Sequence, residues 1–141
     1  MTVTPDDGWR VELEDPAAGD LTAQWEASVC VGRFFGPDEA ANRLEWSAEH
    51  GCTGNYAPQH IEVRLQSTCP DWWCVRFDGE TDYVRSSYAQ DYTLLSNVNR
   101  ALRCESQVKR KYRMTAFAYV RGVQFGPFIS NEVVRSCDIS A

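Results

Sequence analysis

Residues 112–120 read Tyr-Arg-Met-Thr-Ala-Phe-Ala-Tyr-Val, with aromatic, apolar or small side chains at every even position. A period of two is typical of a β-strand, because successive side chains point to opposite faces of a sheet. The odd positions also carry bulk, at Phe117 and Tyr119. We therefore expect this strand to lie in the centre of a sheet.

The clearest alternation in the chain lies further upstream, between residues 21 and 32. Its apolar face is Leu21, Ala23, Trp25, Ala27, Val29 and Val31. This pattern predicts a half-buried strand with Trp25 in the core. Other segments predict strands at 9–13, 44–46, 61–65 and 128–137, loops at 36–59 and 82–91, and a turn at 122–127. Residues 92–102 fit either a helix or a strand, and we favour a strand followed by a turn.

These segments predict an all-β protein, because long helical stretches are missing and turn signals separate many short strands. The expected architecture is an antiparallel β-sandwich with long loop insertions and disulfides. At 141 residues, 43% of them hydrophobic, the chain has the size and composition of one globular domain. We expect a flexible N-terminal tail at 1–8 and a single disulfide-stabilised domain at 9–141. No run approaches the roughly 18 apolar residues of a membrane-spanning helix.

Two segments carry a resemblance to a known family. Leu21-Thr-Ala-Gln-Trp25 is similar to the second strand of a fibronectin type III domain, an immunoglobulin-like β-sandwich, and residues 112–118 resemble its sixth strand. Gly126-Pro127, Ser130 and Val133 resemble its final hairpin. The resemblance implies that Tyr112 is a corner tyrosine, whose hydroxyl ties a loop to the start of the strand. It implies an architecture and not a function, since this fold carries many functions.

Six cysteines, an even number, predict three disulfides and an oxidising compartment. Cys69 and Cys74 are close enough in sequence to form a local bridge. The other four cysteines allow three pairings. We favour Cys30–Cys52 with Cys104–Cys137, because the strands that contain 104 and 137 flank one hairpin. Structural zinc is the alternative, but its paired-ligand spacing is missing.

The compartment and source follow from composition. The disulfides predict a secreted or extracellular protein, and the first residues contain neither the basic start nor the apolar stretch of a signal peptide. We therefore expect a mature chain behind an added methionine. Twelve of the 14 basic residues are arginine and there is no N-glycosylation sequon, which fits a bacterial protein from a GC-rich genome.

Charge is distributed unevenly. The net charge is −6, which argues against a nucleic-acid partner. Residues 1–99 hold 17 acidic and 6 basic residues, a net of −11, whereas residues 100–113 hold 6 basic residues and 1 acidic residue, a net of +5. The basic segment is either one well-solvated hairpin or a patch, including Arg110 and Lys111, that docks an acidic partner.

The segment Cys69-Pro-Asp-Trp-Trp-Cys74 is the most suggestive binding motif. In an extended backbone Trp72 and Trp73 point to opposite faces, so we expect one ring in the core and one in solvent. An exposed tryptophan beside Asp71, on a turn stiffened by a disulfide, is suited to anchor a protein or to stack on a sugar. The alternative is that the 36–59 segment covers both rings.

Other candidate sites are weaker. His50 and Cys52 are two residues apart, but a catalytic pair needs a free thiolate, and a disulfide cysteine beside a surface histidine is the simpler interpretation. We interpret His60 as an edge residue at the start of a strand. Asp78, Glu80 and Asp82 alternate as in some calcium loops, although the spacing of an EF-hand is not met. We expect no cofactor and no catalytic residue.

The sequence favours a secreted, non-enzymatic protein-interaction module, such as an adaptor, a subunit of an extracellular complex or an inhibitor. A carbohydrate-binding module that uses exposed Trp and Tyr residues, with Asp71, Asp78 and Gln66 as hydrogen-bonding groups, is the alternative. The expected partner is an extracellular protein or a glycan, with no nucleic acid and no membrane insertion. Residues 9–13 are expected to pair within the domain or with the sheet edge of a partner.

Overall fold

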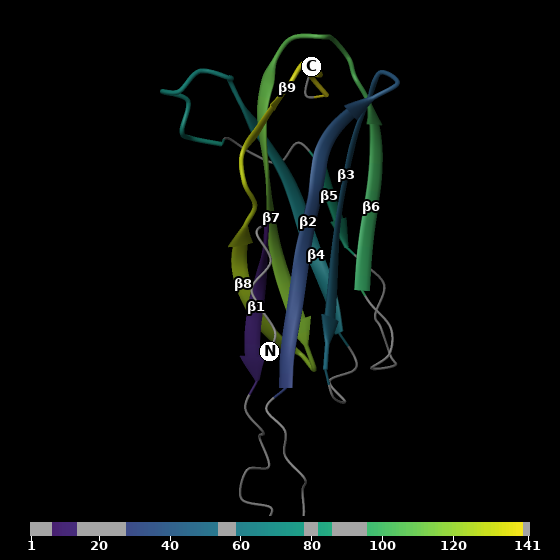
Figure 1. Cartoon of the computed structure of the whole chain (residues 1–141), viewed down its shortest axis with the longest axis vertical. Coiled ribbons are helices and arrows are strands. Elements are labelled where there is room, and N and C mark those ends of the chain that lie inside the picture. The colour runs from purple at the N-terminus through teal and green to yellow at the C-terminus, as the bar shows by residue number, and fades with distance from the viewer. Residues whose placement is uncertain (1–6, 14–27, 54–58, 78–81, 86–95, 140–141) are drawn as a thin grey trace, which may run out of the picture.

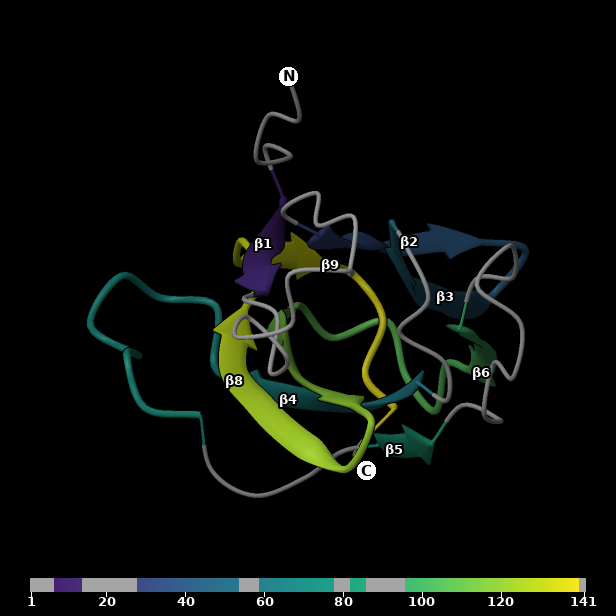
Figure 2. The same cartoon turned by 90° about the horizontal axis from the view of Figure 1, so that it is seen from below.

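Two antiparallel β-sheets pack face to face and form a β-sandwich (Figure 1, Figure 2). The computed structural model describes residues 7–13, 28–53, 59–77, 82–85 and 96–139. This part of the chain contains no helix, and so none that is long and apolar enough to cross a membrane. Its strands are β1 Gly8–Leu13, β2 Ser28–Ala40, β3 Arg43–Cys52, β4 Gln59–Thr68, β5 Asp82–Arg85, β6 Ser96–Arg103, β7 Arg110–Val120, β8 Val123–Ile129 and β9 Val133–Arg135.

The order of strands is β1-β2-β3-β6 in the first sheet, which we call sheet A. In sheet B the order is β5-β4-β7-β8, and β9 also pairs with β7. The all-β fold class is therefore confirmed. The strand at 112–120 is central, as its two bulky faces predict, because β7 is paired with β4 along one side and with β8 and β9 along the other.

β4 and β7 form the longest ladder of sheet B, from the pair Gln59–Val120 to the pair Thr68–Lys111. Alternate residues of both strands point toward sheet A, and these side chains are buried. Their burial is the main stabilising contribution to the core of the sandwich. They meet the inner residues of β3 and β6. The largest fully buried apolar side chains are Trp46, Tyr112, Leu44, Ile61, Leu65, Met114 and Val63.

Residues 36–59 are more regular than the sequence predicts. β2 and β3 form a long hairpin, closed at Ala41 and Asn42, which both have positive φ. Gly36 and Pro37 lie inside β2 at a register shift, where a bulge accommodates them, instead of in a loop. Gly36 has φ +81°, and a Cβ there would lie 2.7 Å from the carbonyl oxygen of Glu45, so the position requires glycine.

β2 also exposes the opposite face from the one we predicted. Cys30, Gly32 and Phe34 face the core, whereas Val29 and Val31 lie on the outer side. The cause is Trp9 of β1, which pairs with Gly32 and whose ring occupies the space above it; a Cβ at Gly32 would lie 1.9 Å from that ring. The predicted burial of Trp25 lies outside the described residues.

Four further segments differ from expectation. The predicted loop at 82–91 begins with β5, which pairs with β4. The predicted turn at 122–127 is mostly β8, in which Gly126 and Pro127 again lie at a register shift. The expected last strand at 128–137 is divided between β8 and β9, and β6 occupies most of the ambiguous 92–102 region. Sequence alone hid these strands because glycine, proline and polar residues are tolerated in edge strands and bulges.

The N-terminal segment pairs within the domain. β1 lies beside β2, and the backbone of Asp7 accepts a hydrogen bond from Phe34 (2.9 Å). The Asp7 carboxylate accepts a second hydrogen bond from the backbone of Asn131. Asp7 therefore contacts β2 of sheet A and the segment between β8 and β9, and Gly8 begins β1. The rest of the predicted tail lies outside the described residues.

The three predicted disulfides are confirmed. Cys30–Cys52 joins the paired strands β2 and β3, and Cys104–Cys137 joins the end of β6 to the segment after β9. Cys69–Cys74 closes the turn after β4. Three disulfides in a chain of this size are typical of extracellular proteins.

Candidate functional site

Residues 69–77, which we call the Trp turn, leave the end of β4 and project from the body of the sandwich (Figure 1, Figure 2). Trp72 is 84% exposed and Trp73 is 62% exposed. The expectation that one ring enters the core is wrong, because residues 70–73 form bends and a turn instead of an extended strand. The alternative in which both rings are covered is also excluded by these exposures.

The Trp turn is closed by covalent and backbone contacts. The Cys69–Cys74 disulfide joins its two sides, and the Cys74 amide donates to the Asp71 carbonyl oxygen (3.0 Å). Trp72 and Trp73 therefore lie at the tip of a turn with few accessible conformations. A restricted loop loses little conformational entropy when it binds.

Lys111 of β7 holds the turn against sheet B. Its ammonium donates to the carbonyl oxygens of Cys74 (2.9 Å) and Asp71 (3.1 Å), and its side chain is buried. Lys111 lies on the outer face of β7, which would normally be in solvent, and the Trp turn covers it. We had placed Lys111 in an exposed basic patch, and the structure places it inside the base of the turn.

The far side of the turn is attached through Phe77. Its ring is buried, and the guanidinium of Arg113 lies 4.3 Å from the ring centre, a cation–π contact. Arg113 also donates to the side-chain oxygen of Gln66 on β4 (3.0 Å). The Trp turn is thus fixed at Cys74 and at Phe77, and the intervening Val75 is 75% exposed.

The other predicted binding residues lie nearby. Asp71 is exposed at the start of the turn, next to Trp72. Arg110 begins β7 and donates to the hydroxyl of Ser67 near the end of β4 (3.1 Å). The structure therefore gathers Asp71, Trp72, Trp73, Arg110 and Lys111 at one end of sheet B. The roles of Lys111, Phe77 and Arg113 as supports were missed, because they depend on a contact between residues more than 30 positions apart.

Both histidines are buried, so the interpretation of His50 as a surface residue is wrong. His50 is fully buried, and its Nδ1 lies 2.5 Å from the side-chain oxygen of Gln59. Burial lowers the pKa of His50 to about 4, although the hydrogen bond to Gln59 opposes this shift. His60 is also buried and stacks on Tyr119 at 4.5 Å, and β4 is not an edge strand, so its predicted edge position is wrong.

Two groups of side chains have the spacing of metal ligands: Cys30, His50 and Cys52 in the core, and Cys69, Asp71 and Cys74 in the Trp turn. In both groups the cysteine sulfurs are joined in disulfides, so they do not offer the thiolates that zinc prefers. Of the predicted calcium loop only Asp82 is described, and its carboxylate accepts from Arg100 (3.0 Å) and from the Trp46 indole (3.1 Å).

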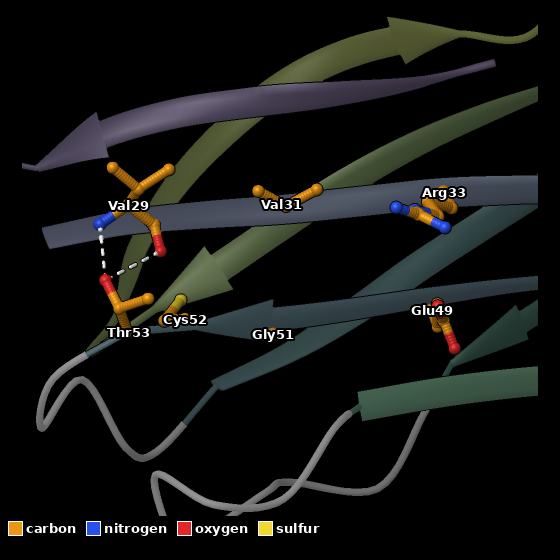
Figure 3. A pocket seen from close by; sticks show the side chains of 7 residues that line it. All are labelled: Val29, Val31, Arg33, Glu49, Gly51, Cys52 and Thr53. Atoms are coloured by element: carbon orange, nitrogen blue, oxygen red, sulfur yellow. Dashed lines mark hydrogen bonds between the residues drawn. The ribbon is translucent and has the colours of Figure 1, made fainter. Parts of the chain in front are cut away.

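A shallow hollow of about 480 Å³ lies on the outer face of β2 and β3 (Figure 3). Val29 and Thr53 line one end of it, Arg33 and Glu49 lie at the other, and Val31 and Gly51 lie between them (Figure 3). The Thr53 hydroxyl is occupied by hydrogen bonds with the backbone of Val29. This arrangement offers little chemical specificity, and the Trp turn is the stronger candidate.

Comparisons with known proteins do not identify a relative: no family model matches the chain, and no curated protein or solved structure matches it.

Proposed function

We propose that this chain is a secreted, non-enzymatic protein-interaction module that binds its partner through the Trp turn. The observation that carries the proposal is the exposure of Trp72 and Trp73 on a turn that is fixed at both sides. Large exposed apolar side chains cost solubility, and tryptophan is enriched among the residues that dominate binding energy in protein interfaces. An adaptor, a subunit of an extracellular complex and an inhibitor all fit this surface.

A carbohydrate-binding module is the competing proposal. Platforms that bind sugars by stacking need coplanar exposed rings, and the rings of Trp72 and Trp73 meet at 85° with their centres 5.9 Å apart. An edge-to-face pair offers one flat ring at most, so the geometry favours a protein partner over a glycan.

We also propose that the sandwich is of the fibronectin type III or immunoglobulin-like type, and the pairing of its strands supports this. In such sandwiches the second strand pairs with the fifth, and the third strand pairs with the sixth. The pairs β3–β6 and β4–β7 reproduce this arrangement if β3 is the second strand of the family. In that correspondence the core tryptophan is Trp46, and not a residue of the 21–25 segment.

Tyr112 fits the place of the corner tyrosine in this proposal. It lies near the start of β7, is fully buried, and donates from its hydroxyl to the carbonyl oxygen of Cys137 (2.5 Å). The amide of Ile139 donates to the same hydroxyl at 3.3 Å. Tyr112 thereby ties the segment after β9 to the start of the strand.

Secretion and a bacterial source remain proposals, supported by the disulfides and by the excess of arginine over lysine. The absence of a catalytic role is also proposed: both histidines are buried and every cysteine that the structure describes is in a disulfide.

The function is tested by affinity capture from culture supernatant of the source organism, with a glycan array in parallel. We expect the wild-type protein and Val123→Ala to retain the same protein, and Trp72→Ala/Trp73→Ala to lose it at least tenfold. Val123 is a matched control because it is an exposed apolar residue at the opposite end of the β4–β7 ladder. Glycan binding without a protein partner, or capture that is insensitive to the two tryptophans, contradicts the proposal.

A further inference from the structure

Four cations lie at the end of sheet B from which the Trp turn leaves, where Thr68 pairs with Lys111. Lys109, Arg110, Lys111 and Arg113 make no ion pair with a carboxylate in the described part of the chain. Three other arginines of the described residues do have a carboxylate partner: Arg10 pairs with Glu12, Arg100 with Asp82 and Arg135 with Asp38, at N–O distances of 3.0–3.2 Å. The four cations at 109–113 therefore have no carboxylate partner among the described residues at this end of sheet B.

Two of these cations contact the Trp turn directly: Lys111 at the carbonyl oxygens of Asp71 and Cys74, and Arg113 at the ring of Phe77. Both lie on the outer face of β7 against the turn, and among the described residues their hydrogen bonds go to neutral oxygens. Charges that are partly removed from water act over longer distances than fully solvated ones, because salt and water screen them less. Asp71 is the one acidic residue among 69–77, and Arg76 lies in the same segment with the opposite sign.

An apolar surface continues from the turn along the edge of sheet B. Val134 pairs with Lys111 and Ile129 pairs with Thr115, so both lie on the same outer face as these β7 residues. Val134 is 41% exposed and Ile129 is 53% exposed. This end of the molecule therefore combines exposed aromatic and aliphatic side chains with uncompensated positive charge.

We infer that the partner is a protein segment in which apolar side chains are flanked by carboxylates. This inference rests on the proposed function and specifies the chemistry of its partner. Carboxylates of the partner complement Lys109, Arg110 and Arg113, while the buried Lys111 supports the turn from below. The partner's apolar side chains cover the two tryptophans and Val75. The charge pattern also steers the encounter: the chain as a whole is at −6, so this end is the one that attracts an acidic surface while the rest repels it.

The same net charge favours a protein over a membrane or a nucleic acid. An extended anionic surface, such as a phospholipid bilayer or a duplex, would face the acidic bulk of the chain as well as the basic end. A short acidic segment contacts the basic end alone.

The inference is tested with three series of fluorescein-labelled synthetic peptides of equal length and equal Leu and Phe content, in which the remaining positions are Asp, Asn or Lys. Binding to the full chain is followed by fluorescence polarisation. We expect the Asp series to bind at least tenfold more tightly than the Asn series. We also expect its affinity to fall about fivefold or more when NaCl is raised from about 50 to about 300 mM, because screening weakens ion pairs at this surface. The Lys series is not expected to bind.

Matched variants locate the site. Lys109→Glu is expected to weaken binding of the Asp series at least fivefold, and Arg121→Glu, the same charge reversal at the far end of β7, to change it less than twofold. Trp72→Ala/Trp73→Ala is expected to abolish binding of the Asp series.

The outcomes separate this inference from the proposed function. Equal binding of the Asp and Asn series through the two tryptophans overturns the acidic partner and leaves the Trp turn as the site. Binding that does not depend on the tryptophans overturns both. Failure of all three series to bind overturns the inference, as does binding of phosphatidylglycerol vesicles in the absence of peptide binding, which assigns the surface to a membrane.

Discussion

The ammonium of Lys111 lies 2.9 Å from the carbonyl oxygen of Cys74, and this contact joins the centre of sheet B to the Trp turn. Lys111 is buried only because the turn folds over it. The carbonyl oxygens of Asp71 and Cys74 in the Trp turn accept hydrogen bonds from this ammonium. A charged donor forms stronger hydrogen bonds than a neutral one. The candidate binding site is therefore supported by a residue that a partner does not need to touch.

Replacement of Lys111 by methionine tests this support. Lys111→Met keeps the length of the side chain but leaves two carbonyl oxygens without a donor, so we expect a loss of about 1–3 kcal/mol in the free energy of unfolding. We also expect faster amide hydrogen exchange at residues 71–77. Lys109→Met, at an exposed neighbouring position, is the control and is expected to change stability by less than about 0.5 kcal/mol. Unchanged exchange in Lys111→Met would show that the disulfide alone holds the turn.

Trp46 and Trp72 are expected to behave in opposite ways when truncated. Trp46 is fully buried and its indole donates to Asp82, so Trp46→Ala leaves a cavity and is expected to cost about 3–5 kcal/mol. Trp72→Ala removes an exposed ring and is expected to change stability by less than about 0.5 kcal/mol. Urea denaturation of both variants measures the difference. A large loss of stability in Trp72→Ala would mean that the ring packs on the protein.

His50 makes stability depend on pH. Burial lowers its pKa to about 4 from 6.5, so between these values the unfolded chain binds a proton that the folded chain excludes. The free energy of unfolding therefore falls as the pH is lowered from 6.5 to about 4, by about 3 kcal/mol when converted at 1.36 kcal/mol per pKa unit. Denaturation midpoints of the wild type and of His50→Phe across this range measure it. We expect the variant to lose most of this slope, and a slope equal to that of the wild type would contradict the assignment.

The disulfides are expected to contribute unequally. Cys104–Cys137 spans 33 residues and Cys69–Cys74 spans 5. In the loop-entropy description, removing the first by double alanine substitution costs about 4 kcal/mol and removing the second about 2 kcal/mol. Thermal unfolding of the two double variants compares them. Alkylation followed by intact-mass measurement should modify six thiols after reduction under denaturing conditions and none before, and any modification before reduction would contradict complete pairing.

The candidate site was visible in the sequence only in part. The local disulfide and the adjacent tryptophans follow from the spacing of residues 69–74, since two cysteines five positions apart can close one turn. The orientation of the rings does not, because it depends on whether the backbone is extended or turned. The sequence predicts Lys111 as a surface cation because its position in the strand faces outward. The segment that covers it follows a different strand, β4, and cannot be foreseen from the residues around Lys111.

Local pattern determined much of the fold. Alternation in 61–65 and 112–120 identified β4 and β7, because a strand buried on one face must place apolar side chains at every second position. The cysteine pairing was also anticipated, although three pairings remained open until the strands were placed. Tertiary structure alone decided that Gly32 and not Val31 faces the core, because a neighbouring strand brings Trp9 onto that glycine. It also decided that the two Gly-Pro pairs form bulges within strands, and that the cations at 109–113 have no carboxylate partner among the residues the structure describes. These features depend on which strands become neighbours, and neighbours are chosen by packing across the whole sandwich, which no local stretch of sequence contains.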